Sequence, residues 1–428
     1  MNLRRNLFAV LLVSALLTGS LVAAQGDEPV KLVFWFHTHP PMVALNEALI
    51  AEYMELHPNV TIEYEVIPNN QFFEKMIVSM TTGVGPDIIN MGNSQLVSDY
   101  IPNGLVDEVD YAAMGYASMD ELLAQYVPAG LKGAMVDGKY YGIPSEFNTD
   151  LLAIYVPDLV AAGYPEDWAP TTWDELGEVA GSLSQFDANG NQTHRGFDLV
   201  YLHAGWYSNQ FQTLAKQTGC TYYNEEGTES TINAPECVAA AQIWRDMIFK
   251  YKAANPALSA RESTVPLQDY IDGTVSMTFI QPWGMELVRQ GNPERWENTK
   301  LVPLPQYDPE NPKTKVNAYY WGVNADSQVQ EEAWKFIAFL ASHPGRWLLE
   351  VNFLQANANM DQLPEAAEFP YAESWMKALE PGEFFQLYPN ANETHEALRV
   401  ALEDILFNDA DIQTTLDNLK AELDFIVQ

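Results

Sequence analysis

The chain has 428 residues, which is too long for one ordinary hydrophobic core and suits two lobes or one large barrel. Its 58 acidic residues outnumber its 22 basic residues by 36, so repulsion excludes nucleic acid and anionic membranes as partners. Apolar residues form 47% of the chain and charged residues 19%, which excludes an intrinsically disordered protein. Aromatic residues form 12% of the chain and call for an explanation.

The first 24 residues have the pattern of a secretory signal peptide. Arg4 and Arg5 give the positive start, 7–17 the apolar core and 22–24 a small-residue cleavage site. The apolar run is too short and too polar for a membrane span. No cysteine lies near the cleavage site, so we expect a periplasmic or extracellular protein without a lipid anchor.

The segment after the signal peptide alternates between strand and helix patterns. The predicted elements are a buried strand at 33–36, a helix over 41–56, a strand at 60–66, a helix over 71–82 and a strand at 86–90. This βαβαβ order predicts an open α/β sheet that binds ligands at the carboxyl ends of its strands.

Further elements follow along the chain. Apolar runs predict strands at 151–156 and 275–280, and helical spacing predicts a helix over 331–340 and terminal helices broken near Asp409. Thr172 and Glu175 form a capping box at the start of another helix. The segment 187–191 is interpreted as a turn between strands, since its glycine is misplaced for a calcium loop.

The two cysteines, Cys220 and Cys237, close a loop of 18 residues. In an oxidising compartment this spacing predicts a disulfide. The alternative, a metal pair, lacks nearby His or Cys to complete the site.

His37-Thr38-His39 directly after the first strand is the sharpest catalytic candidate. Two imidazoles at this spacing can face one metal, so a secreted metal-dependent hydrolase is an alternative reading. Among the remaining histidines only His203 could be a third, strand-end ligand. The chain has no G-x-S-x-G, H-E-x-x-H or G-x-x-x-x-G-K-[ST] string.

Several aromatic residues stand beside polar groups at predicted strand ends and loops. They include Trp35, Trp206, Trp283, the string Tyr319-Tyr320-Trp321, and Tyr388. Indole and phenol rings stack on the C–H faces of sugar rings, while neighbouring amides bind the hydroxyls. Core packing remains the alternative for each ring taken alone.

The order of these motifs resembles the carbohydrate-type extracellular solute-binding proteins of ABC importers, the family that includes maltose-binding protein. The resemblance covers nearly the whole mature chain and rests on the order and spacing of eight strings: 32–35, 83–88, 104–107, 141–144, 148–150, 170–176, 273–278 and 332–337. It implies a two-lobe α/β fold of periplasmic-binding type II, in which each lobe has an open sheet. Hinge crossings are expected near Ile143, Thr278 and Ser342.

The lobes implied by this resemblance are 28–143 plus 278–342 and 144–277 plus 343–428. The implied protein is a monomer that catalyses nothing and needs no cofactor. It takes a sugar or oligosaccharide into the interlobe cleft and delivers it to a membrane permease. A polyamine or peptide ligand is an alternative, which would need inward carboxylates such as Glu146 and Asp150.

The resemblance also implies a set of ligand-binding residues. The set comprises His37, Thr38, Asn93, Ser94, Asn148, Asp150, Trp206, Trp283 and Tyr388, with Tyr320 and Trp321 on the strand near the hinge. The chain departs from maltose-binding protein at His37-Thr38-His39, where that relative has an acidic and basic pair. This departure argues against maltose itself.

Overall fold

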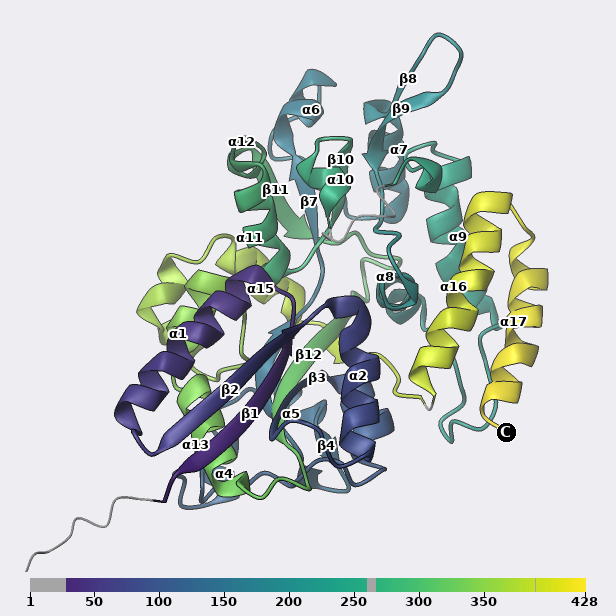
Figure 1. Cartoon of the computed structure of the whole chain (residues 1–428). Coiled ribbons are helices and arrows are strands. Elements are labelled where there is room, and N and C mark those ends of the chain that lie inside the picture. Colours follow the sequence, from purple (N-terminus) through teal and green to yellow (C-terminus); the bar gives the residue numbers. More distant parts are fainter. Residues whose placement is uncertain (1–27, 260–266, 389) are drawn as a thin grey trace, which may run out of the picture.

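The computed structural model describes residues 28–259, 267–388 and 390–428, and the expected signal peptide at 1–24 lies outside them. The described chain forms two α/β lobes, each with its own sheet (Figure 1). None of the helices within the described residues has the length and apolarity needed to cross a membrane. The two-lobe expectation is confirmed.

The first sheet begins with the βαβαβ unit predicted from the sequence. Its parallel strands are β1 (Val30–His37), β2 (Val60–Ile67) and β3 (Ile88–Gly92), joined by α1 (Pro40–Leu56) and α2 (Asn69–Thr81). Leu32, Phe34 and Phe36 of β1 are fully buried. Because β1 and β3 run parallel, their carboxyl ends lie at the same edge of the sheet.

Strands from much later in the chain complete this sheet. The long strand β12 (Thr314–Val323) runs antiparallel to β3, and its other side pairs with β6 (Ile143–Asn148) and β13 (Gly382–Phe384). The first sheet thus combines strands from four separate stretches of the sequence.

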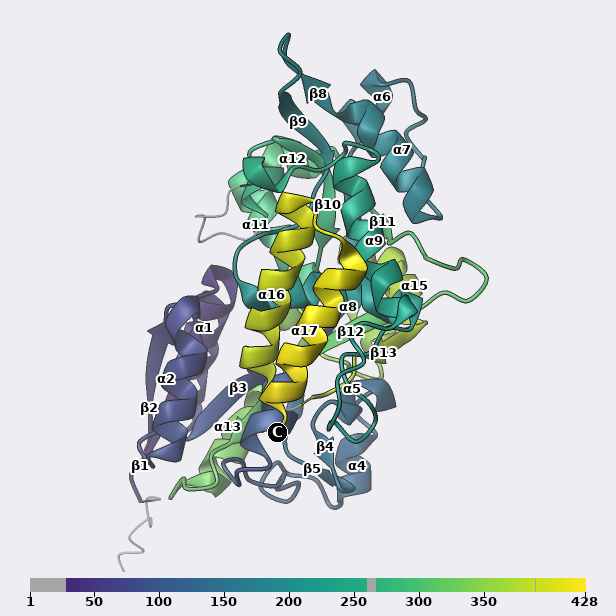
Figure 2. The same ribbon diagram turned by 90° about the vertical axis from the view of Figure 1, so that its right-hand side faces the viewer.

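The second sheet is built from one continuous stretch. In spatial order its strands are β11 (Thr299–Pro303), β7 (Leu151–Tyr155), β10 (Val275–Ile280), β9 (Gln192–Phe197) and β8 (Gln185–Phe186). The turn predicted at 187–191 joins β8 to β9, and the hairpin projects from the top of the molecule (Figures 1 and 2). Asp187 Oδ1 accepts the backbone N–H groups of Asn189 and Asn191 in that turn.

The chain passes between the sheets at places other than those expected. It leaves the first sheet between Asn148 and Leu151 and returns between Pro303 and Thr314. Ile143 instead begins β6 within the first sheet, and Thr278 lies inside β10 of the second. An apolar run predicts a buried strand, but it does not encode which sheet that strand joins.

Shortly after the expected crossing near Ser342, residues 347–356 contribute side chains to the cores of both lobes. Trp347 belongs to the core of the first lobe, whereas Leu348 and Leu354 belong to the same buried cluster as Leu151 and Ala153 of the second. The chain then returns once more, because β13 pairs with β12. The C-terminal part therefore contributes to both lobes.

Helices cover both sheets. The second lobe carries α6 (Val156–Ala161), α7 (Trp173–Leu183), α8 (Ala204–Thr218), α9 (Pro235–Phe249), α10 (Gln268–Ile271), α11 (Pro282–Gly291), α12 (Pro293–Glu297), α16 (Ala391–Asn408) and α17 (Ile412–Ile426). The other elements are α3 (Asn93–Gln95), α4 (Met119–Leu123), α5 (Pro128–Lys132), β4 (Met135–Val136), β5 (Lys139–Tyr140), α13 (Gln330–Ala341), α14 (Pro344–Arg346) and α15 (Ala372–Leu379).

Two predicted helix boundaries are confirmed. Thr172 and Glu175 form both hydrogen bonds of the capping box at the start of α7. Asp409 adopts a left-handed conformation between α16 and α17, which lie side by side over α8 and α9 (Figure 2).

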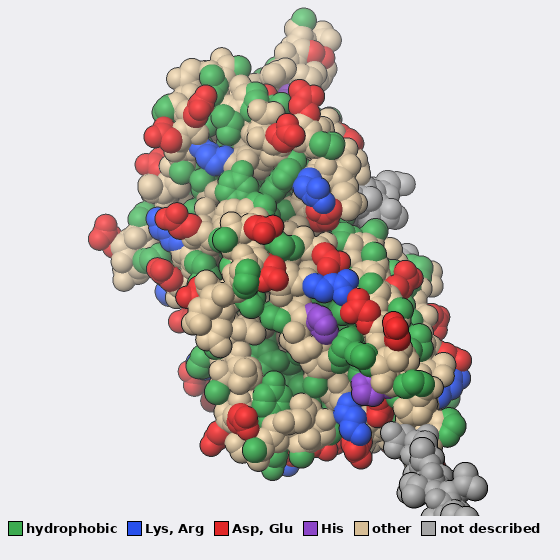
Figure 3. All heavy atoms as spheres, turned by 90° about the vertical axis from the view of Figure 1, so that its left-hand side faces the viewer, with side chains coloured by type: hydrophobic (Ala, Val, Ile, Leu, Met, Phe, Trp, Pro, Cys, Tyr) green, Lys and Arg blue, Asp and Glu red, His purple; other side chains and the backbone are tan. Residues whose placement is uncertain are grey.

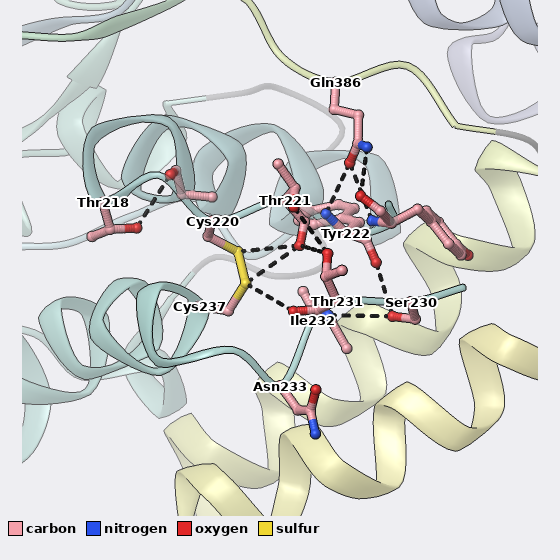
Figure 4. The surroundings of a disulfide bond; sticks show 12 residues. Thr218, Cys220, Thr221, Tyr222, Ser230, Thr231, Ile232, Asn233, Cys237 and Gln386 are labelled. Carbon is pink, nitrogen blue, oxygen red and sulfur yellow. Dashed lines mark hydrogen bonds between the residues drawn. A yellow bond between two sulfur atoms is a disulfide. The ribbon is translucent and has the colours of Figure 1, made fainter. Parts of the chain in front are cut away.

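Cys220 and Cys237 form the predicted disulfide (Figure 4). Cys220 follows the end of α8, and Cys237 lies in the first turn of α9. Both cysteines are buried beside Thr221 and Thr231, whose hydroxyls are hydrogen-bonded 2.9 Å apart. The bond ties the end of one helix to the start of the next.

The acidic excess is a property of the surface. Asp and Glu side chains are scattered over both lobes on the face in Figure 3, where Lys and Arg are fewer. No large single acidic patch dominates this face. The charge therefore does not mark a binding site there.

Candidate functional site

His37 ends β1, and the loop after it brings His39 to the same edge of the first sheet. The His37 ring lies against Phe36, Phe72 and Tyr319, with ring centroids 4.5, 5.5 and 6.2 Å away. His39 caps α1, where its Nδ1 accepts the N–H of Met42 at 3.4 Å. The two imidazoles thus have different surroundings.

Burial keeps both imidazoles neutral. Loss of solvation lowers the pKa of His37 to about 4. The same cause, reinforced by neighbouring His37, lowers the pKa of His39 to about 3. His37 Nδ1 and His39 Nε2 find no hydrogen-bond partner among the described residues. Each ring can therefore offer a ligand an uncharged donor or acceptor.

Two tryptophans from the second lobe approach this loop. Trp283 lies in the first turn of α11, directly after β10, and Trp206 lies in the first turn of α8. The centroid of Trp283 is 5.8 Å from that of Trp206 and 6.0 Å from that of His39. Trp283 also packs on the core of the first lobe. The aromatic group therefore spans both lobes.

A row of polar side chains lies on one face of β6 and β12. Asn317 stands directly opposite Asn148, and Tyr319 opposite Glu146, so their side chains share a face. Asn148 Nδ2 donates to Glu146 Oε1, and Lys315 Nζ donates to Asn317 Oδ1 at 3.1 Å. Asn148 Oδ1 and Asn317 Nδ2 have no partner among the described residues.

Burial shifts the two ionisable groups of this row in opposite directions. Loss of solvation raises the pKa of Glu146 to about 8, opposed by the hydrogen bond from Asn148. It lowers the pKa of Lys315 to about 8, opposed by the charge of Asp150. Glu146 is therefore mainly a neutral acid at pH 7.

The raised pKa of Glu146 predicts a pH-dependent stability. Unfolded glutamate ionises near pH 4.5, while the folded protein keeps the proton up to about pH 8. Folding takes up a proton between these values, so the contribution to stability is complete below the lower pKa and is lost as the pH rises. Glu146→Gln should become more stable relative to wild type by up to ~1.4 kcal/mol per pH unit in this window. Urea unfolding of both proteins at pH 5 to 8 checks this, and a constant difference would contradict it.

Asp150 lies in the passage between β6 and β7 and is buried. Its Oδ2 accepts the hydroxyl of Thr213 at 2.6 Å, and its Oδ1 accepts the side-chain amide of Gln281 at 2.7 Å. Both oxygens therefore already serve protein donors.

The structure places three of the expected ligand-binding residues in cores. Tyr320 and Trp321 are buried in the first lobe, and Trp321 contacts Trp347. Tyr388 is buried in the second lobe, where its hydroxyl lies 2.7 Å from His395 Nε2. For these three rings the core-packing alternative describes the structure better.

The remaining expected residues lie near the end of β1 or β3. Thr38 is exposed, and its backbone N–H donates to the carbonyl of Ile67. Asn93 and Ser94 are half-buried in α3, just after β3. Asn93 also lines a pocket of about 270 Å³ together with Phe384 and Phe385.

Sequence reasoning missed other polar residues, which lie on β6 and β12. Asn317 and Lys315 were not singled out, and Glu146 entered only as an alternative. The alternation of Lys315 and Asn317 along β12, and of Glu146 and Asn148 along β6, is the signal that could have revealed them. A group of three or more His, Cys, Asp or Glu suited to a metal ion does not occur among the residues that the structure describes.

A family model described as bacterial extracellular solute-binding protein matches residues 37–347. The chain belongs to this family. This solute-binding protein is 21% identical over 410 residues to the maltotriose-binding protein of Pyrococcus abyssi, covering 92% of this chain and 82% of the relative.

Solved structures agree with the fold of this solute-binding protein. The Lmo0181 protein of Listeria monocytogenes in complex with cycloalternan has a TM-score of 0.80 at 20% identity, over 93% of this chain and 99% of that one. Maltose-bound MalE3 of T. maritima has a TM-score of 0.79 at 19% identity, over 93% and 100% of the respective chains. The family and these neighbours are binding proteins.

Proposed function

We propose that this solute-binding protein captures a sugar or oligosaccharide between its lobes and delivers it unchanged to an ABC permease. The family assignment supports a bacterial extracellular binding protein. Similar proteins that are described with maltotriose, cycloalternan or maltose support the carbohydrate class. We further propose that the protein is exported by its signal peptide, carries no lipid anchor and acts as a monomer.

The observation that carries the carbohydrate proposal is a set of buried polar atoms beside aromatic rings. These atoms have no hydrogen-bond partner among the described residues: His37 Nδ1, His39 Nε2, Asn148 Oδ1 and Asn317 Nδ2. Buried polar groups are costly unless paired, so a bound molecule should pair them. Sugar hydroxyls both donate and accept, which fits this mixed set, and Trp206 and Trp283 offer stacking surfaces.

The ionisable groups argue against a cationic ligand. A polyamine needs ionised carboxylates facing it, whereas burial keeps Glu146 protonated with a pKa of about 8. Asp150 already accepts from Thr213 and Gln281. A neutral polyhydroxylated ligand does not need a charged partner.

We propose that the segments 149–150 and 304–313 form the hinge. The first joins β6 of the first sheet to β7 of the second, and the other joins β11 of the second sheet to β12 of the first. The lobes would then comprise 28–148 with β12, α13 and β13, and 151–303 with α16 and α17. Closing of the lobes around the ligand would present both to the permease.

A thermal-shift screen tests the proposed ligand class. The panel contains maltose, maltotriose, cycloalternan, spermidine and a tripeptide at equal concentration. We expect stabilisation by at least one carbohydrate and by neither of the others, because only a ligand bound to the folded state raises the melting temperature. A shift with spermidine or the peptide alone would refute the carbohydrate proposal.

A further inference from the structure

A chain of hydrogen bonds runs from the interlobe passage to the aromatic group. Asp150 Oδ1 accepts from Gln281 Nε2 at 2.7 Å, and Gln281 Oε1 accepts from Trp283 Nε1 at 2.8 Å. Asp150 and Gln281 are buried, so water competes little for these bonds. We call these three residues the Asp150 relay.

The donor chemistry allows only one orientation of the Gln281 amide. An indole N–H can only donate, so it must meet the amide oxygen of Gln281. The amide nitrogen then points to the opposite side, where Asp150 supplies an acceptor. Gln281 therefore cannot flip without losing both bonds.

The other end of the relay is anchored as well. Asp150 Oδ2 accepts the Thr213 hydroxyl of α8 at 2.6 Å, and Asp150 itself belongs to the passage between β6 and β7. Trp283 at the far end lies between Trp206 of the second lobe and His39 of the first. The relay thus links the connection between the lobes to a ring that contacts both.

We propose that Asp150 is a positioning residue, which acts through Gln281 to hold the Trp283 indole in the orientation that stacks on the sugar. This assignment replaces direct ligand binding by Asp150 and rests on the proposed function for its stacking role. A tryptophan side chain can turn about two side-chain angles. An acceptor at Nε1 restricts them before the sugar arrives, so less conformational entropy is lost on binding.

The test follows the indole N–H resonance of Trp283 in the sugar-free protein labelled with ¹⁵N-tryptophan. Its signal is assigned by its absence from Trp283→Phe. We expect Asp150→Ala and Gln281→Met to shift this signal and to speed its exchange with solvent, although neither changes the indole. Gln212→Met, which removes a glutamine that bonds Tyr388 instead, is the matched control and should leave the signal in place.

Asp150→Asn should keep the Trp283 signal at its wild-type position. Its carbonyl can accept from Gln281 while its amide donates to the Thr213 hydroxyl. If Asp150→Ala does not fold, Gln281→Met carries the same test without removing the buried carboxyl. An unchanged Trp283 signal in Gln281→Met would overturn the relay.

Maltotriose titrations of the same variants measure the consequence for binding. Asp150→Ala and Gln281→Met should each raise Kd about tenfold, and the double variant should raise it no further. Additive effects would overturn the assignment, since they mean that the two residues act separately. A wild-type protein that bound no sugar would refute the proposed function, while the sugar-free resonance would still decide the relay.

Discussion

Trp283→Ala should weaken carbohydrate binding about ten- to a hundredfold. The indole provides a large apolar surface at the junction, between Trp206 and His39, and its loss removes stacking that alanine cannot replace. This change in Kd corresponds to ~1.4 to ~2.8 kcal/mol of binding free energy. Isothermal titration with maltotriose measures the effect.

Trp168→Ala is the control for this experiment. Trp168 is also a half-buried tryptophan of the second lobe, but it packs on Tyr164 away from His39. The Trp168→Ala variant should bind maltotriose with the same Kd as wild type. Equal affinities of Trp283→Ala and wild type would remove Trp283 from the site. Circular dichroism of both variants checks that the fold is retained.

Loss of the disulfide should destabilise the protein by ~3 kcal/mol. Cys220 and Cys237 are 17 positions apart, so the bond restricts a loop of moderate length in the unfolded chain. Urea unfolding of the double variant Cys220→Ala/Cys237→Ala, compared with wild type, measures the difference.

Reductant separates the bond from the packing of the cysteine side chains. Reductant should lower the free energy of unfolding of wild type to near that of the variant. It should leave the stability of the variant unchanged, because the variant has no cysteine. Identical wild-type unfolding with and without reductant would contradict a stabilising role of the bond.

Local patterns in the sequence predicted much of this fold. The βαβαβ unit, the capping box of Thr172 and Glu175, the break at Asp409 and the disulfide all depend on neighbouring residues or short loops. Periodicity and capping chemistry act over a few residues, so a single sequence carries them. The order of the motifs was also sufficient to indicate the extracellular solute-binding family, which the family model confirms.

Sheet membership and side-chain direction could not be predicted in this way. The apolar run of β10 is equally consistent with either sheet, and only its pairing with β7 and β9 decides. On β12, the string Tyr319-Tyr320-Trp321 gives no sign of which ring faces the core. Tyr320 and Trp321 are buried there, while Tyr319 lies next to His37.

The unequal origin of the two sheets sets the order in which the sheets, though not the lobes, can be completed. All strands of the second sheet come from 151–303, so that sheet can form as soon as this stretch is available. The first sheet must wait for β12 and β13, more than 200 residues after β3. Such distant pairings slow folding. An exported chain with this topology stays incompletely folded until nearly all of it has been delivered.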